Sequence, residues 1–228
     1  MTHTPVKLTF EQYLEYDDGT DNRYELFDGE LVPVPSESEE NGWIAVWLMY
    51  KLAKFVNPRL VRPHEGELQV IGKPPNRFPD LVVIGEEHLT RPRKRFIITL
   101  DMAPPPFVVE VVSPYRNQKD ENYQRDYIDK VHQYQERGIP EYWIIDPQAR
   151  LVTVLLLVGG RYQATEFSGS QRIVSQTFPE LEVNLKLLVA ERGAGGRSLI
   201  VKDCKNLGFK FPKFGVLSAW ALQYQYRF

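Results

Sequence analysis

An almost unbroken apolar run, "PPPFVVEVVSP" at residues 104–114, constrains the fold more than any other stretch of the chain. A short apolar run bounded by prolines is typical of a strand that is buried on both faces of a sheet. Successive side chains of a strand point to opposite faces, so Glu110 shares its face with Val108 and Val112. Burying an ionised carboxylate is costly unless it is paired or binds a metal. Glu110 therefore predicts a buried ion pair, a metal ligand, or a strand face open to solvent.

The chain before this run carries signals for a hairpin and a helix. Asp28 and Gly29 separate two short apolar runs, which predicts a hairpin with strands at about 23–27 and 30–34. Apolar residues at helical spacing then predict a helix that ends before Pro58. The segments "LVRPHEGELQVIG" and "PDLVVIG" read as strands that lead toward the apolar run.

The chain after the run continues with a helix and more strands. Residues 120–137 form a polar, amphipathic pattern that ends at Gly138, which predicts a helix. Strands are expected in "EYWIID", "LVTVLLLV" and "RYQATEF". Strands interleaved with helices indicate a mixed α/β domain, of the α+β kind.

The distribution of charge divides the chain into a body and a tail. Residues 1–191 hold 21 Lys and Arg against 29 Asp and Glu, whereas residues 192–228 hold 7 against one. We expect one domain over residues 1–189 and a basic, Gly- and aromatic-containing tail over residues 190–228. An acidic body argues against a broad DNA-coating surface, because such binding neutralises phosphates, but it leaves room for a small basic groove.

Composition also bounds the compartment and the chemistry. The single cysteine, Cys204, excludes an internal disulfide framework and a cysteine-based zinc site. No apolar stretch approaches the roughly 20 residues that a membrane span needs. The N-terminal stretch "MTHTPVKLTF" lacks the apolar centre of a signal peptide. We therefore expect a cytoplasmic protein with no membrane partner.

Three further charged side chains stand where a site could form. Asp80 opens the strand "PDLVVIG", Glu25 lies in the first hairpin, and Lys130 lies on the helix that follows the Glu110 strand. Each has an ordinary structural alternative: a strand-start turn for Asp80, an arginine partner for Glu25, and a salt bridge four residues apart with Asp126 for Lys130. A helix that follows a strand packs back on the sheet, however, so Lys130 can reach carboxylates on the covered face.

Two carboxylates on neighbouring strands can hold a hard divalent cation. Mg²⁺ prefers oxygen ligands, and it typically takes one or two carboxylates together with phosphate oxygens. Such a site, with an ammonium close by, can orient water against a phosphodiester. On this reading Glu110 is a metal ligand.

The order of four motifs, "RYELFDGELV", "PDLVVI", "VVEVVSP" and "DYIDKVHQYQERGIPEYWIID", resembles the Uma2 family, also called DUF820, over roughly residues 7–189. These bacterial proteins are assigned to the PD-(D/E)XK nuclease superfamily and labelled restriction endonucleases. The resemblance implies a restriction-endonuclease-like core, which is a central mixed β-sheet flanked by helices. It also implies a Mg²⁺-dependent endonuclease acting on DNA, with Mn²⁺ as the alternative ion.

The resemblance assigns roles to individual residues. Asp80, which follows Pro79, and Glu110 correspond to the metal ligands, and Glu25 corresponds to an additional glutamate of the first hairpin. The superfamily's usual lysine falls two residues after the acidic one, and Val112 occupies that place. The family pattern supplies the lysine from the following helix, which matches Lys130.

Two other functions remain open at this point. One is a catalytically inactive nuclease-fold module that binds protein or nucleic acid, which Val112 and the acidic body favour. The other is a homodimer without a ligand, assembled through the aromatic tail. The basic loop "RPRKRF" at residues 91–96 could clamp phosphates or be a solvated surface loop. His64, His88 and His132 lack a metal-ligand spacing such as H-x-x-x-H, and His132 is expected to be exposed on the polar helix.

Overall fold

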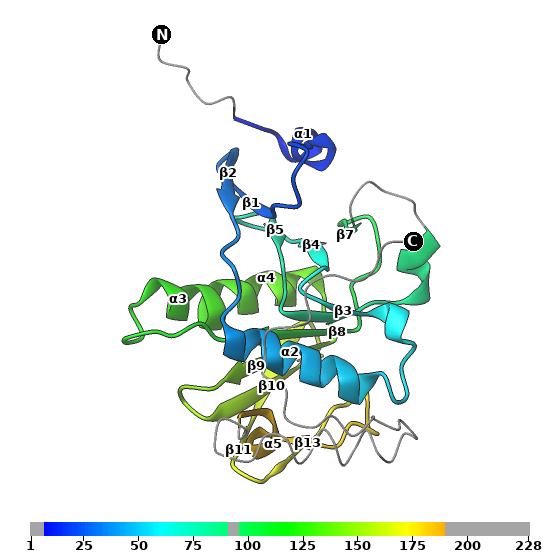
Figure 1. Ribbon diagram of the computed structural model, residues 1–228, viewed down its shortest axis with the longest axis vertical. Helices are drawn as coiled ribbons and strands as arrows, with labels where there is room; N and C mark the ends of the chain where they lie inside the picture. The colour runs from blue at the N-terminus through cyan, green and yellow to red at the C-terminus, as the bar shows by residue number, and fades with distance from the viewer. Residues whose placement is uncertain (1–6, 91–95, 190–228) are drawn as a thin grey trace, which may run out of the picture. The chain divides into compact units, whose positions relative to one another are not determined.

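The computed structural model describes residues 7–90 and 96–189, and it has a mixed sheet with helices on both faces (Figure 1). The strands are β1 (Tyr24–Phe27), β2 (Glu30–Pro33), β3 (Val61–Pro63), β4 (Glu67–Gln69), β5 (Asn76–Arg77), β6 (Leu81–Val83), β7 (Ile97–Ile98), β8 (Phe107–Val111), β9 (Glu141–Asp146), β10 (Leu151–Val158), β11 (Arg161–Ser168), β12 (Arg172–Ile173) and β13 (Val183–Asn184). The α-helices are α1 (Phe10–Glu15), α2 (Glu39–Leu52), α3 (Glu121–Gln124), α4 (Lys130–Arg137) and α5 (Leu185–Val189). Two 3₁₀ turns, η1 (Pro58–Leu60) and η2 (Glu86–Thr90), and a π-helical turn, η3 (Arg125–Asp129), complete the elements.

The central sheet has six strands in the order β11-β10-β9-β8-β6-β3. Strands β8 and β9 are parallel, and every other neighbouring pair in this sheet is antiparallel. Parallel neighbours need a crossover connection, and α3, η3 and α4 supply it between β8 and β9. The mixed α+β class predicted from the sequence is confirmed, and so is the hairpin of β1 and β2.

Helices cover the two faces of this sheet with different sets of side chains. On one face, Ile44 and Leu48 of α2 pack in one apolar cluster with Phe107 and Val109 of β8. On the other face, Tyr134 of α4 packs in a second cluster, to which the alternate residues of β8 and β6 contribute. Figure 1 shows α2 and α4 passing on either side of the central strands. Alternation along β8 therefore decides which helix each side chain meets.

The helix expected at 120–137 is interrupted by one π-helical turn. Helix α3 begins after Asp120, whose side chain accepts a hydrogen bond from the backbone N–H of Asn122. The turn η3 then carries the chain into α4, which ends at Gly138 with the left-handed φ of 80° expected of that glycine. A π-helical turn accommodates one extra residue within a helix and often marks a functional site.

The strand expected in "LVRPHEGELQVIG" is divided into two strands of different sheets. Strand β3 belongs to the central sheet, whereas β4 lies in a three-stranded sheet with β5 and β7. The chain changes direction at His64, which has a φ of 55°. A positive φ is unusual for a residue other than glycine, and it breaks the extended backbone here.

Some predictions lie outside the described residues. They are the tail at residues 190–228 and residues 91–95 of the basic loop. Among the residues that are described, no helix has the length and apolar character needed to cross a membrane.

Candidate functional site

Strand pairing brings Asp80 and Glu110 together at one end of β6 and β8. The antiparallel register pairs Leu81 with Val109. Continuing this register by one residue sets Asp80 opposite Glu110. The Oδ2 atom of Asp80 accepts a hydrogen bond of 2.6 Å from the backbone N–H of Val111, which fixes the carboxylate against β8.

Glu110 is 1% exposed and uses both of its carboxylate oxygens. Its Oε2 accepts a hydrogen bond of 2.8 Å from Nζ of Lys130, and its Oε1 accepts one of 2.5 Å from the hydroxyl of Tyr134. Burial raises the pKa of Glu110, and the interactions with Lys130 and Tyr134 oppose that shift only in part. The buried ion pair is therefore present, and its cation is the residue that the family pattern singles out.

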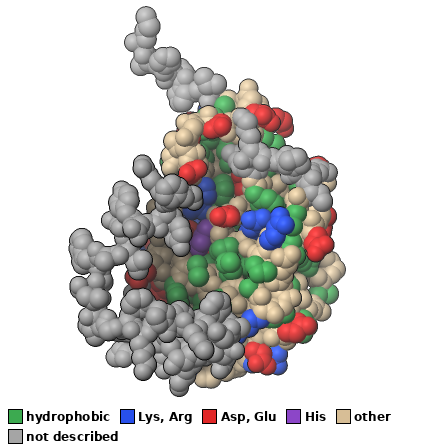
Figure 2. Space-filling view, turned by 45° about the vertical axis from the view of Figure 1, so that its right-hand side comes forward, with side chains coloured by type: hydrophobic (Ala, Val, Ile, Leu, Met, Phe, Trp, Pro, Cys, Tyr) green, Lys and Arg blue, Asp and Glu red, His purple; other side chains and the backbone are tan. Residues whose placement is uncertain are grey.

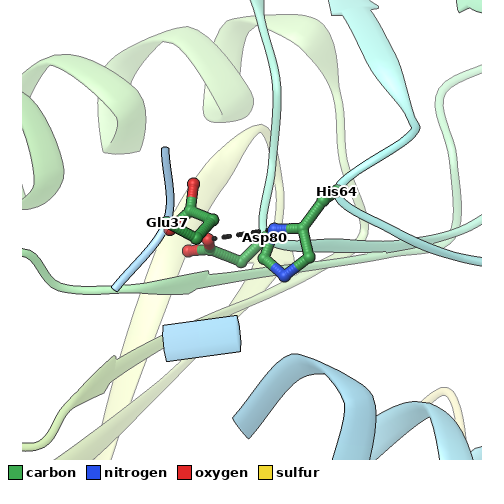
Figure 3. A group of neighbouring side chains, drawn as sticks. All are labelled: Glu37, His64 and Asp80. Carbon is green, nitrogen blue, oxygen red and sulfur yellow. Dashed lines mark ion pairs between the residues drawn. The ribbon is translucent and has the colours of Figure 1, made fainter. Parts of the chain in front are cut away.

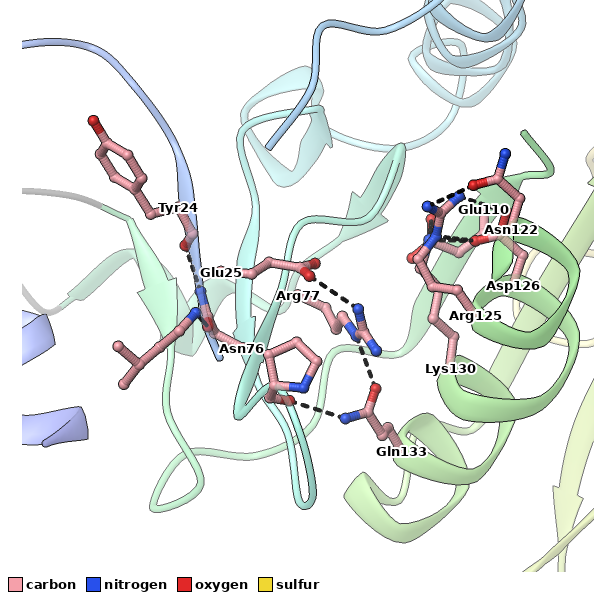
Figure 4. Close-up of polar contacts among 12 residues, drawn as sticks. Tyr24, Glu25, Asn76, Arg77, Glu110, Asn122, Arg125, Asp126, Lys130 and Gln133 are labelled. Carbon is pink, nitrogen blue, oxygen red and sulfur yellow. Dashed lines mark hydrogen bonds and ion pairs between the residues drawn. The ribbon is translucent and has the colours of Figure 1, made fainter. Parts of the chain in front are cut away.

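Lys130 bridges two carboxylates in the interior (Figure 4). Its Nζ lies 3.0 Å from Oδ1 of Asp126, in addition to its contact with Glu110. Burial alone would lower the pKa of Lys130, but Glu110, Asp126 and Asp80 hold it above its ordinary value. These carboxylates favour the ammonium form of the amine, which can donate hydrogen bonds and carry charge.

Asp126 ties the helix to the end of β8. Its Oδ2 accepts a hydrogen bond from the backbone N–H of Ser113, and Nε of Arg125 lies 2.9 Å from its Oδ1. Burial would raise the pKa of Asp126, yet Lys130 and Arg125 outweigh burial and lower that pKa to about 2. A permanently charged Asp126 thus helps to hold the ammonium of Lys130 in place.

Glu25 reaches the same cavity with an arginine partner. Its Oε2 lies 3.0 Å from Nη1 of Arg77, and Nε of Arg77 donates a hydrogen bond to Gln133 of α4 (Figure 4). Glu25 and the other three residues predicted from the sequence all line one cavity of about 570 Å³. The structure therefore brings Asp80, Glu110 and Lys130 into one cluster and leaves Glu25 in a separate ion pair at its margin.

Two side chains that the sequence analysis did not select lie beside Asp80 (Figure 3). Ligand atoms of Glu37, His64 and Asp80 all lie within 4.8 Å of one another, a group that could hold a metal ion. Nδ1 of His64 is 3.6 Å from Oδ1 of Asp80. The spacing of the histidines gave no signal for His64 in the sequence, because it is the turn at its positive φ that brings the imidazole back to Asp80.

Residues 10–187 match the model of the Uma2 family, which is described as "Putative restriction endonuclease". The chain belongs to the Uma2 family. A crystal structure of "a putative nuclease belonging to DUF820" from Anabaena variabilis ATCC 29413 is similar to this chain, with a TM-score of 0.59 and 17% identity over 80% of this chain and 97% of that one. That likeness shows a shared fold. A search of curated proteins finds no match.

The family resemblance places the superfamily's usual lysine at Val112, and in this Uma2 chain that place is apolar. Val112 is 4% exposed and packs in the apolar cluster beneath α4. Its backbone N–H donates to the carbonyl of Ile145, so it lies within the sheet. Among the described residues, Lys130 on the helix is the only cation that an ion pair links to Glu110.

The potential ligand atoms of this Uma2 site fit a divalent cation. Asp80, Glu110 and Glu37 offer carboxylate oxygens, which hard cations such as Mg²⁺ prefer. Burial raises the pKa of Asp80 well above its ordinary value, and the charges of Glu110 and Glu37 raise it further. A cation between these carboxylates would relieve that repulsion and favour their charged forms.

Proposed function

We propose that this chain is a Mg²⁺-dependent endonuclease that hydrolyses phosphodiester bonds in DNA, with Mn²⁺ as an alternative ion. The observation that carries the proposal is the convergence of Asp80, Glu110 and the Lys130 ammonium on one cavity. Membership of a family described as restriction endonucleases supports the nuclease class. Fold alone would not establish it, because one fold serves many functions.

Each residue of the cluster has a distinct part in the proposed reaction. Asp80 and Glu110 would hold the cation, which supplies a Lewis acid for a phosphate oxygen when it is bound. The Lys130 ammonium orients the attacking water by donating a hydrogen bond and stabilises the negative charge that develops on the phosphate. Glu25, which is paired with Arg77 at the margin of the cavity, would support a metal ligand or a second metal.

The surface is consistent with local contact to DNA. On the face shown in Figure 2, acidic and basic side chains are interspersed and a histidine lies among them. A chain of net charge −2 is not suited to coating DNA over a broad area. Binding through a cavity that gathers a cation, Arg77 and Lys130 requires only a few phosphates.

The direct test is cleavage of supercoiled plasmid DNA by the full chain in Mg²⁺. Asp80→Asn should abolish Mg²⁺-dependent cleavage, and Lys130→Met should reduce its rate by about 100-fold or more, because a preorganised charge is lost. Lys119→Met, which changes an exposed lysine of the same segment, is the matched control and should cleave normally. Cleavage at the wild-type rate by either site variant, with circular dichroism showing a folded protein, would refute the assigned role.

A second candidate is a Uma2 module that binds nucleic acid without cleaving it. It is favoured by Val112 at the usual lysine place and by the pairing of Lys130 with two carboxylates, which leaves the amine less free to act. This candidate predicts DNA binding in gel-shift experiments and intact plasmid in both Mg²⁺ and Mn²⁺. Cleavage that depends on Asp80 would exclude it.

A further inference from the structure

We propose a second divalent-cation position, formed by Glu37, His64 and Asp80, that shares Asp80 with the position between Asp80 and Glu110. For its part in hydrolysis this inference rests on the proposed function, but cation binding itself can be measured without DNA. Neither the Uma2 motifs nor the predicted acidic residues include Glu37 or His64, so the position follows from the geometry of this chain.

The ligand atoms are already close to the required arrangement. Atoms bound at about 2.2 Å to a common ion lie at most about 4.4 Å apart, and those of Glu37, His64 and Asp80 lie within 4.8 Å of one another. Glu37 is exposed, in the loop before α2, so its side chain can move the remaining few tenths of an ångström at little cost. Figure 3 shows the three side chains next to one another, with the imidazole of His64 facing the carboxylate of Asp80.

The backbone holds His64 against Asp80 independently of any ion. The N–H of His64 donates a hydrogen bond of 3.0 Å to the carbonyl of Asp80, and Arg23 donates to the carbonyl of His64. The main chain of His64 is therefore fixed next to Asp80, which keeps the imidazole within reach of the carboxylate. Burial lowers the pKa of His64, which favours the neutral imidazole that binds metals.

Asp80 lies between the two proposed positions. His64 faces its Oδ1 on one side, and Glu110 lies opposite on the neighbouring strand. Cations about 3.5–4 Å apart that share a carboxylate can stabilise both the attacking and the leaving oxygen of a phosphodiester. Glu37, Asp80 and Glu110 all line one cavity, so two cations that share Asp80 would be held by carboxylates from three separate segments of the chain.

The two positions should differ in the ion that they prefer. Asp80 and Glu110 offer only oxygen, which suits Mg²⁺, whereas His64 adds an imidazole nitrogen, which suits transition metals more than Mg²⁺. Mn²⁺ is accommodated by both ligand types, so it is the probe that should fill both positions.

The test is a Mn²⁺ titration of the full chain without DNA, read from the electron paramagnetic resonance signal of free Mn²⁺. The wild type should bind two ions per chain. His64→Asn and Glu37→Gln should each weaken one ion by about tenfold or more, as expected when a ligand is removed, and Asp80→Asn should weaken both. Asparagine is chosen at position 64 because it tolerates a positive φ, and Glu37→Gln, at an exposed site, serves if the first variant fails to fold.

The controls match each change in residue type. His132→Gln and Glu136→Gln alter an exposed histidine and an exposed glutamate of α4, and both should retain two ions. Thermal denaturation with and without Mn²⁺ gives a second readout, because a ligand of the native state raises its stability.

Each remaining outcome separates this inference from the proposed function. A single ion that is lost in Glu110→Gln but retained in His64→Asn and Glu37→Gln overturns the second position and leaves the proposed function standing. A single ion that is retained in Glu110→Gln but lost in His64→Asn and Glu37→Gln supports the position at His64 and overturns the role of Glu110. No binding by the wild type overturns both.

Discussion

The two faces of the central sheet are built from the same strands but carry different chemistry. On the face covered by α2, strand β8 contributes Phe107, Val109 and Val111 to an apolar cluster, and the buried acid beside them, Glu141 of β9, accepts hydrogen bonds from Trp143 and from backbone N–H groups instead of pairing with a cation. On the face covered by α4, the same strand contributes Val108 and Glu110, and α4 adds an ammonium. Alternation along one strand therefore separates a face that stabilises the fold from a face that carries the candidate site.

The difference shows where buried charge is tolerated. Glu110, Asp126 and Lys130 are all buried, yet each has a charged partner within 3.0 Å. A buried ion pair is weak evidence for stability, because hydrophobic residues of similar volume often stabilise as well or better. The ion pair lies at the end of the sheet that opens into the cavity. The proposed function explains this position better than a gain in stability does.

Truncation of a buried side chain on the apolar face should cause the largest loss of unfolding free energy. Phe107 is fully buried and makes edge-on contacts with Trp143 and Phe178, with ring centroids 5.2 and 5.3 Å apart. Phe107→Ala should cost about 4 kcal/mol of unfolding free energy, measured by urea denaturation, because it leaves a cavity in a packed core. Phe27→Ala, at an exposed phenylalanine, should cost less than about 0.5 kcal/mol. Equal losses in the two variants would contradict the assignment of this face as the core.

On the charged face, the free energy of unfolding should depend on the loss of one charge rather than on the loss of side-chain volume. Lys130→Met should cost about 3 kcal/mol at pH 7, because it leaves Glu110 and Asp126 buried without their cation. The loss should shrink on acidification, since burial raises the pKa of Glu110 and a protonated Glu110 no longer needs the ammonium. Lys119→Met should have no such effect in the same urea series. A loss that does not depend on pH would indicate that packing, not charge, explains it.

The smallest expected effect concerns the charge of Asp126, whose contribution to stability is lost in acid. Its pKa is about 2 in the folded chain and 3.8 ordinarily, so its charge contributes about 2 kcal/mol of stability above pH 4. A lowered folded pKa means that this contribution is lost as the pH falls from about 4 to 2. The stability gap between the wild type and Asp126→Asn should therefore narrow over that interval in urea denaturation.

Asp129→Asn is the control for that titration, because Asp129 is an exposed neighbour in the same turn. Its stability should follow that of the wild type throughout. If the difference in unfolding free energy between the wild type and Asp126→Asn stays constant down to pH 2, the carboxylate stabilises the fold through its packing and not through its charge.

The sequence predicted the fold and part of the site because local patterns carry both. Alternation in "FVVEVVS" placed Glu110 on its face, and the strand order placed Asp80 beside it. The helical step from Asp126 to Lys130 indicated a salt bridge, which the structure contains. The packing of a helix back on the strand before it indicated that Lys130 can reach Glu110, and the Uma2 motifs pointed to the same lysine.

The rest depended on tertiary contacts that no local pattern encodes. Glu37 lies in a polar loop that looks like any solvated segment, and His64 has no partner at metal-ligand spacing. Only the reversal of the chain at a φ of 55° brings His64 to Asp80. The π-helical turn at η3 likewise leaves the polar pattern of the helix unchanged, so periodicity predicted a continuous helix.

Because the ammonium comes from a helix and not from the strand, its position beside Glu110 depends on how that helix packs. A lysine on the same strand as the acid would keep its place for as long as the strand stayed paired. Here the amine keeps its place only while α4 remains docked on the sheet, and docked helices can open locally at less cost than global unfolding. A small separation of α4 from β8 would take the Lys130 ammonium away from Glu110 reversibly while leaving most of the core intact.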